Sequence, residues 1–230
     1  QQRALVLDRE GWLHMLAISP GGSQEGLWKA CHTGARVAAM PRDGSRVVSA
    51  AMGEVDDWDP GSGAPVAVFG KAGARVTALA VGMGGQAMLS GGLDGTIRLW
   101  EWKTARCVRT FTGHRGSVKA MTFLDAADCA LSAGADGTVR LWDLRSGSCR
   151  RTFEGHGGGV LAIAAFAGGS AAVSGGMDAS VRIWRCGRHG IATAPLMLCR
   201  PRCTQEMEKE DRSIEGLLAR ADAAVENGQL

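Results

Sequence analysis

The sequence predicts an all-β fold: a β-propeller of about four to five four-stranded blades that forms an incomplete ring and is followed by a C-terminal α-helix. Three observations lead there: residues recur every 42 positions, each period holds four short strand-like runs, and glycine is abundant. The 230-residue chain has 34 glycines and 6 prolines, which suits many tight turns better than long helices. Hydrophobic residues make up 45% and charged residues 21%, a globular composition that can bury a core.

The 42-residue interval holds for several residue types at once. Four tryptophans mark it: Trp58, Trp100, Trp142 and Trp184. Aspartates, phenylalanines, serines and arginines share it: Asp94, Asp136, Asp178; Phe69, Phe111, Phe153; Ser90, Ser132, Ser174; Arg98, Arg140, Arg182. Chance does not hold so many residue types in one register over three periods, so the chain is built from repeated structural units.

Each period divides into strands and turns. The strand-like runs of one period are 118–123, 129–132, 138–142 and 149–153. Turn residues such as Asp136-Gly137 and Ser146-Gly147 separate them. Each run is about six residues long, too short for a helix, and four such strands in every period describe a propeller blade.

The repeat divides the chain into successive units. We expect a partial blade with the last three strands of a unit at 1–33, and blades at 34–70, 71–112, 113–154 and 155–194. Residues 195–230 are expected to form a linker and an amphipathic helix. About four and a half blades leave the ring incomplete, so we expect a partner, a second chain or missing sequence to complete the propeller. The first residue, Gln1, also suggests a processed or truncated chain.

Two segments identify the repeat. Gly113–Asp143 (GHRGSV…LSAGADGTVRLWD) and Gly155–Trp184 (GHGGGV…VSGGMDASVRIW) resemble WD repeats, and the resemblance covers residues 1–194. It implies a WD-repeat β-propeller in which a His, a Ser, an Asp and a Trp form one hydrogen-bonded chain inside each blade. The resemblance places two such structural tetrads here: His114, Ser132, Asp136 and Trp142, and His156, Ser174, Asp178 and Trp184.

The two preceding units depart from this pattern. Ala72 stands where the unit at 71–112 should carry the His. The unit at 34–70 keeps Ser49 and Trp58 but has Met52-Gly53 near the position of the turn Asp. Full tetrads are therefore expected in only two blades.

Catalytic and metal-binding interpretations are weaker. His114, Asp136 and Ser132 have the residue types of a catalytic triad, but the set occurs twice with a Trp attached and lacks a nucleophile elbow, which favours a structural role. Cys186, His189, Cys199 and Cys203 offer zinc ligands at a spacing that matches no zinc module we know. Arginines in the 42-residue register suggest a phosphate-binding ring, although such side chains also cover apolar neighbours. We expect no enzyme activity, metal or cofactor.

The C-terminal segment changes period. From Thr204, a plausible N-cap, apolar residues recur at steps of three and four: Met207, Ile214, Leu217, Leu218, Ala221, Ala224 and Val225. This pattern predicts an amphipathic helix. Residues 203–230 hold seven acids and three bases, a charge of −4, while the rest carries +7. The helix is expected to dock on the propeller, pair with a partner or stay partly disordered.

The function expected from the resemblance is a non-enzymatic protein–protein interaction scaffold in a multiprotein complex. Partners of this family commonly dock on the rim where blades begin and on the turn before the Asp. The partner-binding candidates are Arg75, Leu93, Arg115, Ser117 and Met177. The run Trp142-Asp143-Leu144-Arg145 resembles the box of cullin-RING ubiquitin ligase substrate receptors, so that class is the alternative and Arg145 the further candidate.

Composition limits the expected classes of binding partner and the expected cellular compartment. The net charge of +3 and the lack of aromatic–basic clusters make nucleic acid an unlikely partner and predict no membrane binding. No small-molecule substrate is expected. Seven cysteines without a secretory signal suggest free thiols in a reducing compartment, hence an intracellular protein, cytoplasmic or nuclear.

Overall fold

The computed structural model describes residues 2–18, 24–32, 34–41, 43–82, 84–124, 128–166, 169–186 and 196–199. Over these residues the chain forms five antiparallel sheets. This confirms the all-β prediction, while the helix predicted within 195–230 lies outside the described residues. None of the described residues forms a helix that is both long and apolar enough to cross a membrane.

The strands follow the chain from sheet to sheet. The first two sheets contain β1 (Gln2–Leu7), β2 (Trp12–Ile18) and β3 (Gln24–Cys31), then β4 (Ala35–Ala39), β5 (Val47–Ala51), β6 (Glu54–Trp58) and β7 (Pro65–Lys71). The third contains β8 (Val76–Gly82), β9 (Ala87–Gly92), β10 (Ile97–Glu101) and β11 (Arg106–Phe111). The fourth contains β12 (Val118–Leu124), β13 (Cys129–Gly134), β14 (Val139–Asp143) and β15 (Cys149–Phe153). The last contains β16 (Val160–Phe166), β17 (Ala171–Gly176), β18 (Val181–Arg185) and β19 (Leu196–Cys199).

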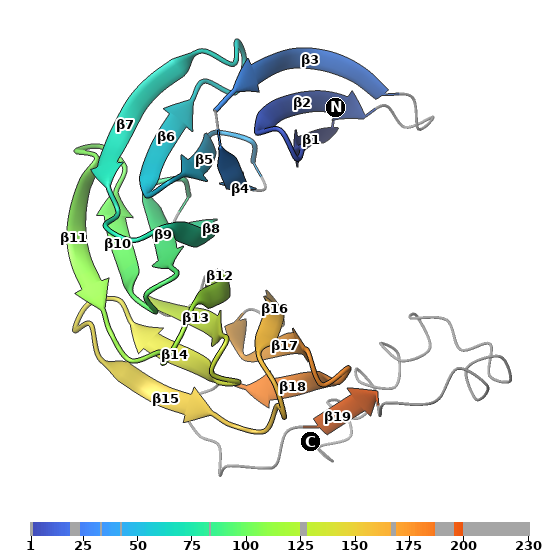
Figure 1. Cartoon of the computed structure of the whole chain (residues 1–230), viewed down its shortest axis with the longest axis vertical. Coiled ribbons are helices and arrows are strands. Elements are labelled where there is room, and N and C mark those ends of the chain that lie inside the picture. The colour runs from blue at the N-terminus through green and yellow to red at the C-terminus, as the bar shows by residue number, and fades with distance from the viewer. Residues whose placement is uncertain are drawn as a thin grey trace, which may run out of the picture.

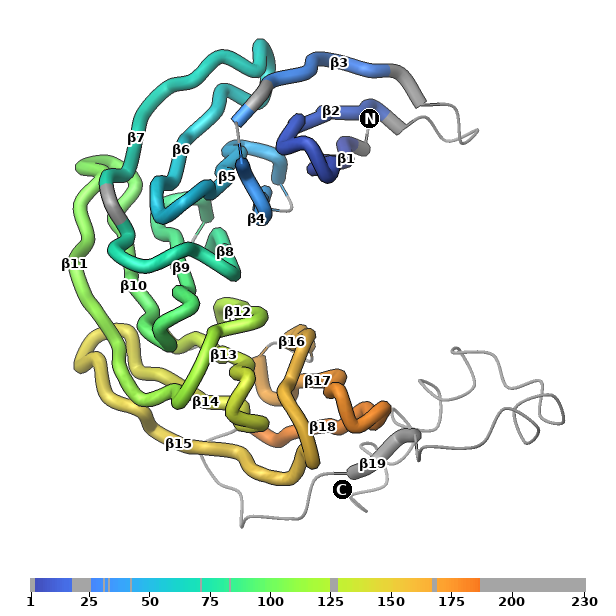
Figure 2. The backbone as a smooth tube through the Cα atoms, in the orientation of Figure 1, coloured from blue at the N-terminus to red at the C-terminus, as the bar shows by residue number. Residues whose placement is uncertain are grey.

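The sheets are arranged as the blades of an open arc. Figure 1 shows β4, β8, β12 and β16 lining the inside of the arc and β3, β7, β11 and β15 on its outside. The tube in Figure 2 runs back and forth within one sheet before it passes to the next. Because β19 pairs with β18, the last blade includes residues that the sequence analysis assigned to the linker.

The core lies between neighbouring blades. A phenylalanine at the end of one outer strand packs against a tryptophan of the following blade. The ring centroids lie 5.7 Å apart for Phe111 and Trp142 and 5.5 Å apart for Phe153 and Trp184. Both partners recur every 42 residues, so one packing step is repeated along the arc. Burying each of these large side chains contributes about 1.5–3 kcal/mol.

The first sheet has one strand fewer than the others. Strand β1 is equivalent to β13, which lies three 42-residue periods later in the sequence. The hairpin turn after each strand is closed by the same two backbone hydrogen bonds. Their donors are the N–H groups of Asp8 and Gly11 in the first blade and of Gly134 and Gly137 in the fourth. β13 pairs with a strand on both sides, whereas β1 pairs only with β2 among the described strands. Strands β1, β2 and β3 thus correspond to the second, third and fourth strands of the later blades.

Candidate protein-interaction surface

The fourth blade contains the complete predicted network. Trp142 donates its indole N–H to Ser132 Oγ at 2.8 Å, and Ser132 Oγ lies 2.7 Å from His114 Nε2. His114 Nδ1 lies 3.0 Å from Asp136, which also accepts the N–H of Arg115 at 3.0 Å. A neutral His114 satisfies every atom when Nδ1–H donates to Asp136 and Nε2 accepts from the serine hydroxyl.

The fifth blade repeats the network. Trp184 donates to Ser174 Oγ at 2.7 Å, and Ser174 Oγ lies 2.8 Å from His156 Nε2. His156 Nδ1 lies 2.9 Å from Asp178, and this carboxylate accepts the N–H of Gly157 at 2.8 Å. The structure therefore brings the four residues of each predicted tetrad together, with the Asp tying a turn to the loop that enters the blade.

Burial and hydrogen bonding fix the charges of this network. The His114 side chain is fully buried, and burial lowers the pKa of His114 while the adjacent Asp136 opposes that shift. For Asp136, burial acts to raise the pKa, but the bonds from the Arg115 N–H, from His114 and from Thr138 outweigh it and hold the pKa at about 2. A neutral histidine that donates to an ionised aspartate forms a stable hydrogen bond between the two side chains, which is the structural role expected of this network.

A third network, which the sequence analysis missed, lies in the second blade. His32 Nδ1 lies 2.6 Å from Ser49 Oγ, and Trp58 donates to the same oxygen at 2.8 Å. Asp56, on strand β6, replaces the turn Asp and lies 3.4 Å from His32 Nε2. Burial raises the pKa of Asp56, and the neighbouring His32 opposes that effect. His32 and Ser49 are 17 residues apart, against 18 for His114 and Ser132, so the set falls outside the strict register.

The third blade keeps only half of the network. Trp100 donates to Ser90 Oγ at 2.9 Å, while the buried Ala72 occupies the histidine position, as the sequence predicts. A different tie joins this blade to the second: Trp102 donates its N–H to Asp57 at 2.9 Å. Burial raises the pKa of Asp57 although this bond opposes it. Sequence reasoning did not find this pair because it spans 45 residues and occurs once.

Turns and loops interlock along one rim of the arc. Leu93, in the turn between β9 and β10, donates its N–H to the carbonyl of Arg75, in the loop that enters the same blade. Next to it, Gly95 has φ +79°, and a Cβ there would lie 2.6 Å from the carbonyl oxygen of His114 in the following blade. Only glycine fits this contact. Turns before the Asp position and entry loops therefore form one surface.

The predicted partner-binding residues differ in exposure on this rim. Leu93 is 54% exposed and Met177 71%, and both Arg75 and Arg115 are exposed. Ser117 is only 6% exposed and uses its carbonyl to bind the N–H of Ala135. We therefore leave Ser117 out of the candidate surface.

Met52 joins the surface although sequence reasoning did not select it. It occupies the equivalent turn of the second blade at φ +46° and is 83% exposed. We call Met52, Arg75, Leu93, Arg115 and Met177 the turn rim. Its signal in the sequence was a methionine at a turn position, displaced by one residue from the 42-residue register.

The further candidate Arg145 lies at the opposite rim. Successive hairpin turns alternate between the two ends of the strands, and Arg145 follows β14 whereas Leu93 precedes β10. Its exposed side chain forms an ion pair with Asp128 at 2.7 Å. Of the cysteine–histidine cluster, only the side chain of Cys186 is described, and burial raises its pKa to about 11. No group of three or more metal-ligating side chains occurs within the described ranges.

The repeated blades and their polar networks define a WD-repeat propeller. The family model described as "WD domain, G-beta repeat" matches residues 63–101, 105–143 and 147–185, just over half of the chain. The chain belongs to the WD40 repeat family.

Similarity to curated proteins is confined to short stretches. A U3 snoRNP-associated protein-like YAOH of Oryza sativa subsp. japonica is 41% identical over 49 residues, which is 21% of this chain and 10% of that protein. A ribosome biogenesis protein BOP1 homolog of Monosiga brevicollis is 44% identical over 57 residues, which is 25% of this chain and 7% of that protein. The chain thus spans a tenth or less of the length of these relatives.

Solved structures support the fold. A structure of U3-55K superimposes with a TM-score of 0.63 at 24% identity over 71% of this chain and 51% of the other. The RRP9 WD40 repeats give 0.62 at 24% identity over 71% and 50%. At this identity the likeness concerns the fold alone. None of these proteins is described as a ligase receptor, so the comparisons lend no support to the cullin-RING alternative.

Proposed function

We propose that this protein is a non-enzymatic scaffold that binds other proteins through the turn rim. The observation that carries the proposal is the exposure of Met52, Leu93 and Met177 at equivalent turns of three blades. Large apolar side chains gathered on one surface are typical of interaction sites. Arg75 and Arg115 stand beside them, and arginine is enriched among residues that dominate binding energy.

The polar residues support a scaffold over an enzyme. The histidine, serine and aspartate of each tetrad bond to one another and to the backbone, which uses them to hold strands and loops in place. A catalytic base needs an accessible path to a substrate proton. The side chains of His114 and His156 are fully buried, which disfavours that role.

We further propose that the complex is a ribonucleoprotein assembly. This rests on the names of the two matched relatives, one a U3 snoRNP-associated protein-like and the other a ribosome biogenesis protein homolog. The same names favour a nuclear location over a cytoplasmic one. They also make RNA an expected component of the proposed complex. We keep the scaffold's direct partner as protein, because the turn rim combines apolar side chains with only two arginines.

A paired set of variants tests the scaffold. Replacing Met52, Leu93 and Met177 by serine should reduce recovery of specific partners at least about fivefold in affinity capture with quantitative mass spectrometry. The matched control replaces Val66, Val68 and Val108 on the outer strands, which are 56%, 61% and 53% exposed. Nuclease treatment before capture separates protein-mediated from RNA-mediated recovery. Equal recovery with both triple variants would contradict the turn rim as the binding surface.

A further inference from the structure

The outer strands of the third and fourth blades are strongly basic. These strands, β11 and β15, form this part of the outside of the arc (Figure 1). Together they carry four arginines and no acidic residue, and every residue before their terminal phenylalanines is exposed or half-buried. The outer strand of the second blade, β7, has no arginine. Positive charge is therefore gathered on one stretch of the outside of the arc.

Two of these arginines extend to the next blade. Arg109 donates to the carbonyl of Ser146 at 3.1 Å, and Arg151 donates to the carbonyl of Arg185 at 3.5 Å. The two donors are 42 residues apart, so they occupy the same position in successive blades. Each contact brings the guanidinium of one outer strand against the following blade, so the positive charge runs from the third blade to the fifth without a break.

Most of this charge has no acidic partner. Arg145 and Arg150 are paired with aspartates. Over the described ranges, five other cations on or beside the outer strands form no ion pair with a carboxylate: Lys103, Arg106, Arg109, Arg151 and Arg185. We call these five residues the outer basic belt. A guanidinium has five N–H donors, and the two arginines that extend to the next blade each use only one of them on a carbonyl.

The neighbouring side chains suit phosphate groups better than bases. Thr110 and Thr152 are exposed beside the belt and also lie 42 residues apart. Threonine hydroxyls commonly donate to phosphate oxygens. The only aromatic residues of the two strands, Phe111 and Phe153, are buried, so these strands offer no ring on which a base could stack. We therefore expect contact with a nucleic-acid backbone and little dependence on base sequence.

We propose that the outer basic belt binds the phosphate backbone of RNA. This rests on the proposed ribonucleoprotein complex and adds a second surface, on the outside of the arc, to the turn rim. The net charge of +3 does not indicate this surface, because it averages the belt with acids elsewhere in the chain. Clustered cations create a local potential that attracts an anion even when the whole protein is nearly neutral.

Salt dependence measures how many phosphates the belt neutralises. For a single strand, the logarithm of the binding constant falls by about 0.7 per phosphate contact for each unit in the logarithm of the salt concentration. Contact by all five cations gives a slope of about −3.5, so affinity should fall about a hundredfold between 50 and 200 mM salt. Fluorescence anisotropy of a labelled oligouridylate with the full 230-residue chain measures this slope. An unstructured oligonucleotide of mixed sequence should give a similar slope.

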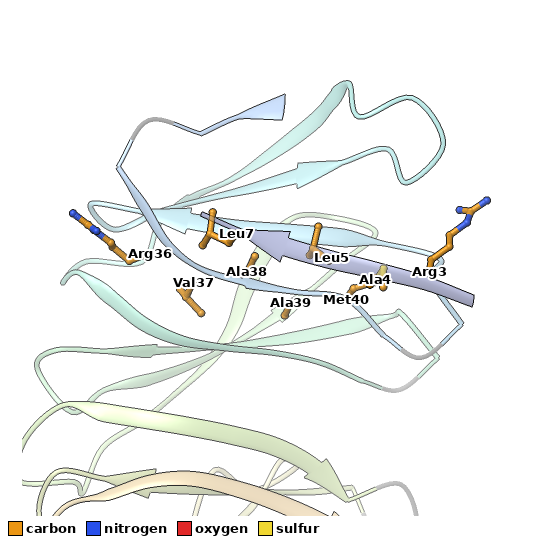
Figure 3. A pocket seen from close by; sticks show the side chains of 9 residues that line it. All are labelled: Arg3, Ala4, Leu5, Leu7, Arg36, Val37, Ala38, Ala39 and Met40. Atoms are coloured by element: carbon orange, nitrogen blue, oxygen red, sulfur yellow. The ribbon is translucent and has the colours of Figure 1, made fainter. Parts of the chain in front are cut away.

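Matched double variants locate the site. Arg109→Gln with Arg151→Gln removes two contacts, so the slope should change to about −2.1 and RNA binding should weaken at least about fivefold. The control, Arg3→Gln with Arg36→Gln, removes the same charge from the first two blades. Figure 3 shows these two arginines at opposite ends of the groove between β1 and β4. Each donates to a backbone carbonyl at 3.5 Å, as the belt arginines do, and the control should bind RNA like the wild type.

A conservative variant separates loss of charge from loss of fold. Arg109→Lys with Arg151→Lys keeps both positive charges, so it should keep the wild-type salt slope. Circular dichroism should show the same fold for all three double variants. A glutamine variant that weakens binding while the lysine variant does not would identify charge as the cause.

Three outcomes would overturn the inference. They are no measurable RNA binding, equal binding by the two glutamine variants, or a salt slope that neither glutamine variant changes. Polyglutamate that competes as well as RNA would instead assign the belt to an acidic protein. Because turn-rim capture after nuclease treatment depends on other residues and on a protein partner, failure of the belt and failure of the scaffold are distinguishable.

Discussion

Replacing the network serine tests how much the histidine link contributes to a blade. Ser132 Oγ accepts the Trp142 N–H and donates to His114 Nε2, and its residue is 1% exposed. Ser132→Ala therefore leaves two buried polar atoms without a partner. An orphaned buried group costs about 1–3 kcal/mol, so we expect a loss of about 2–6 kcal/mol in the free energy of unfolding.

The third blade supplies the matched control. Ser90 is 2% exposed and accepts the Trp100 N–H, but Ala72 stands in place of the histidine. Ser90→Ala orphans only the indole N–H and should cost about 1–3 kcal/mol. Both substitutions remove the same single atom from the same strand position, so differences in packing largely cancel.

Thermal unfolding followed by circular dichroism measures the comparison. One kcal/mol shifts the Tm by about 2–4 °C in a domain of this size, and the shift for Ser132→Ala should be about twice that for Ser90→Ala. Equal shifts would show that the bond between Ser132 and His114 adds nothing, and the account of the network as a stabilising chain would be wrong.

Three further predictions concern the network of the fourth blade and a buried cysteine of the fifth. Asp136→Asn should lower the Tm at pH 7. The difference from wild type should shrink as the pH falls from about 4 to about 2, because the depressed pKa of Asp136 stabilises the fold only while the carboxylate is ionised. A constant difference in Tm across a pH titration would contradict this. The lowered pKa of His114 stabilises the fold above about pH 6.5, so the wild-type Tm should fall as the pH drops below that value, and a flat or rising Tm between pH 7.5 and 5 would refute it. Cys186, whose pKa burial raises, should react with iodoacetamide at pH 8 much more slowly than the exposed Cys107, as peptide mass spectrometry would reveal; equal labelling would count against it.

The sequence predicted the repeated parts because their physics is local and periodic. Strand alternation, turn residues and the Trp–Ser–His–Asp spacing lie within about thirty residues, and each recurs. The second-blade network escaped because its spacing is one residue shorter and because Asp56 approaches the His32 ring from a strand instead of a turn. No regular interval could reveal that substitution.

Exposure was harder to predict than position. Ser117 and Arg115 lie two residues apart in the same loop, yet one is buried and the other exposed. The backbone bond from Ala135 to the Ser117 carbonyl does not explain this, because Arg75 accepts the equivalent bond from Leu93 and is exposed.

The repeated step between a phenylalanine and the next tryptophan has a consequence for the size of the assembly. Among the described strands, each of the three middle blades contacts the blade before it and the blade after it. The Phe–Trp contact from the third to the fourth blade is nearly the same as that from the fourth to the fifth. No single junction therefore records how many blades the arc should contain. A further blade would repeat a junction that the chain already contains, since the blades associate through nearest-neighbour contacts.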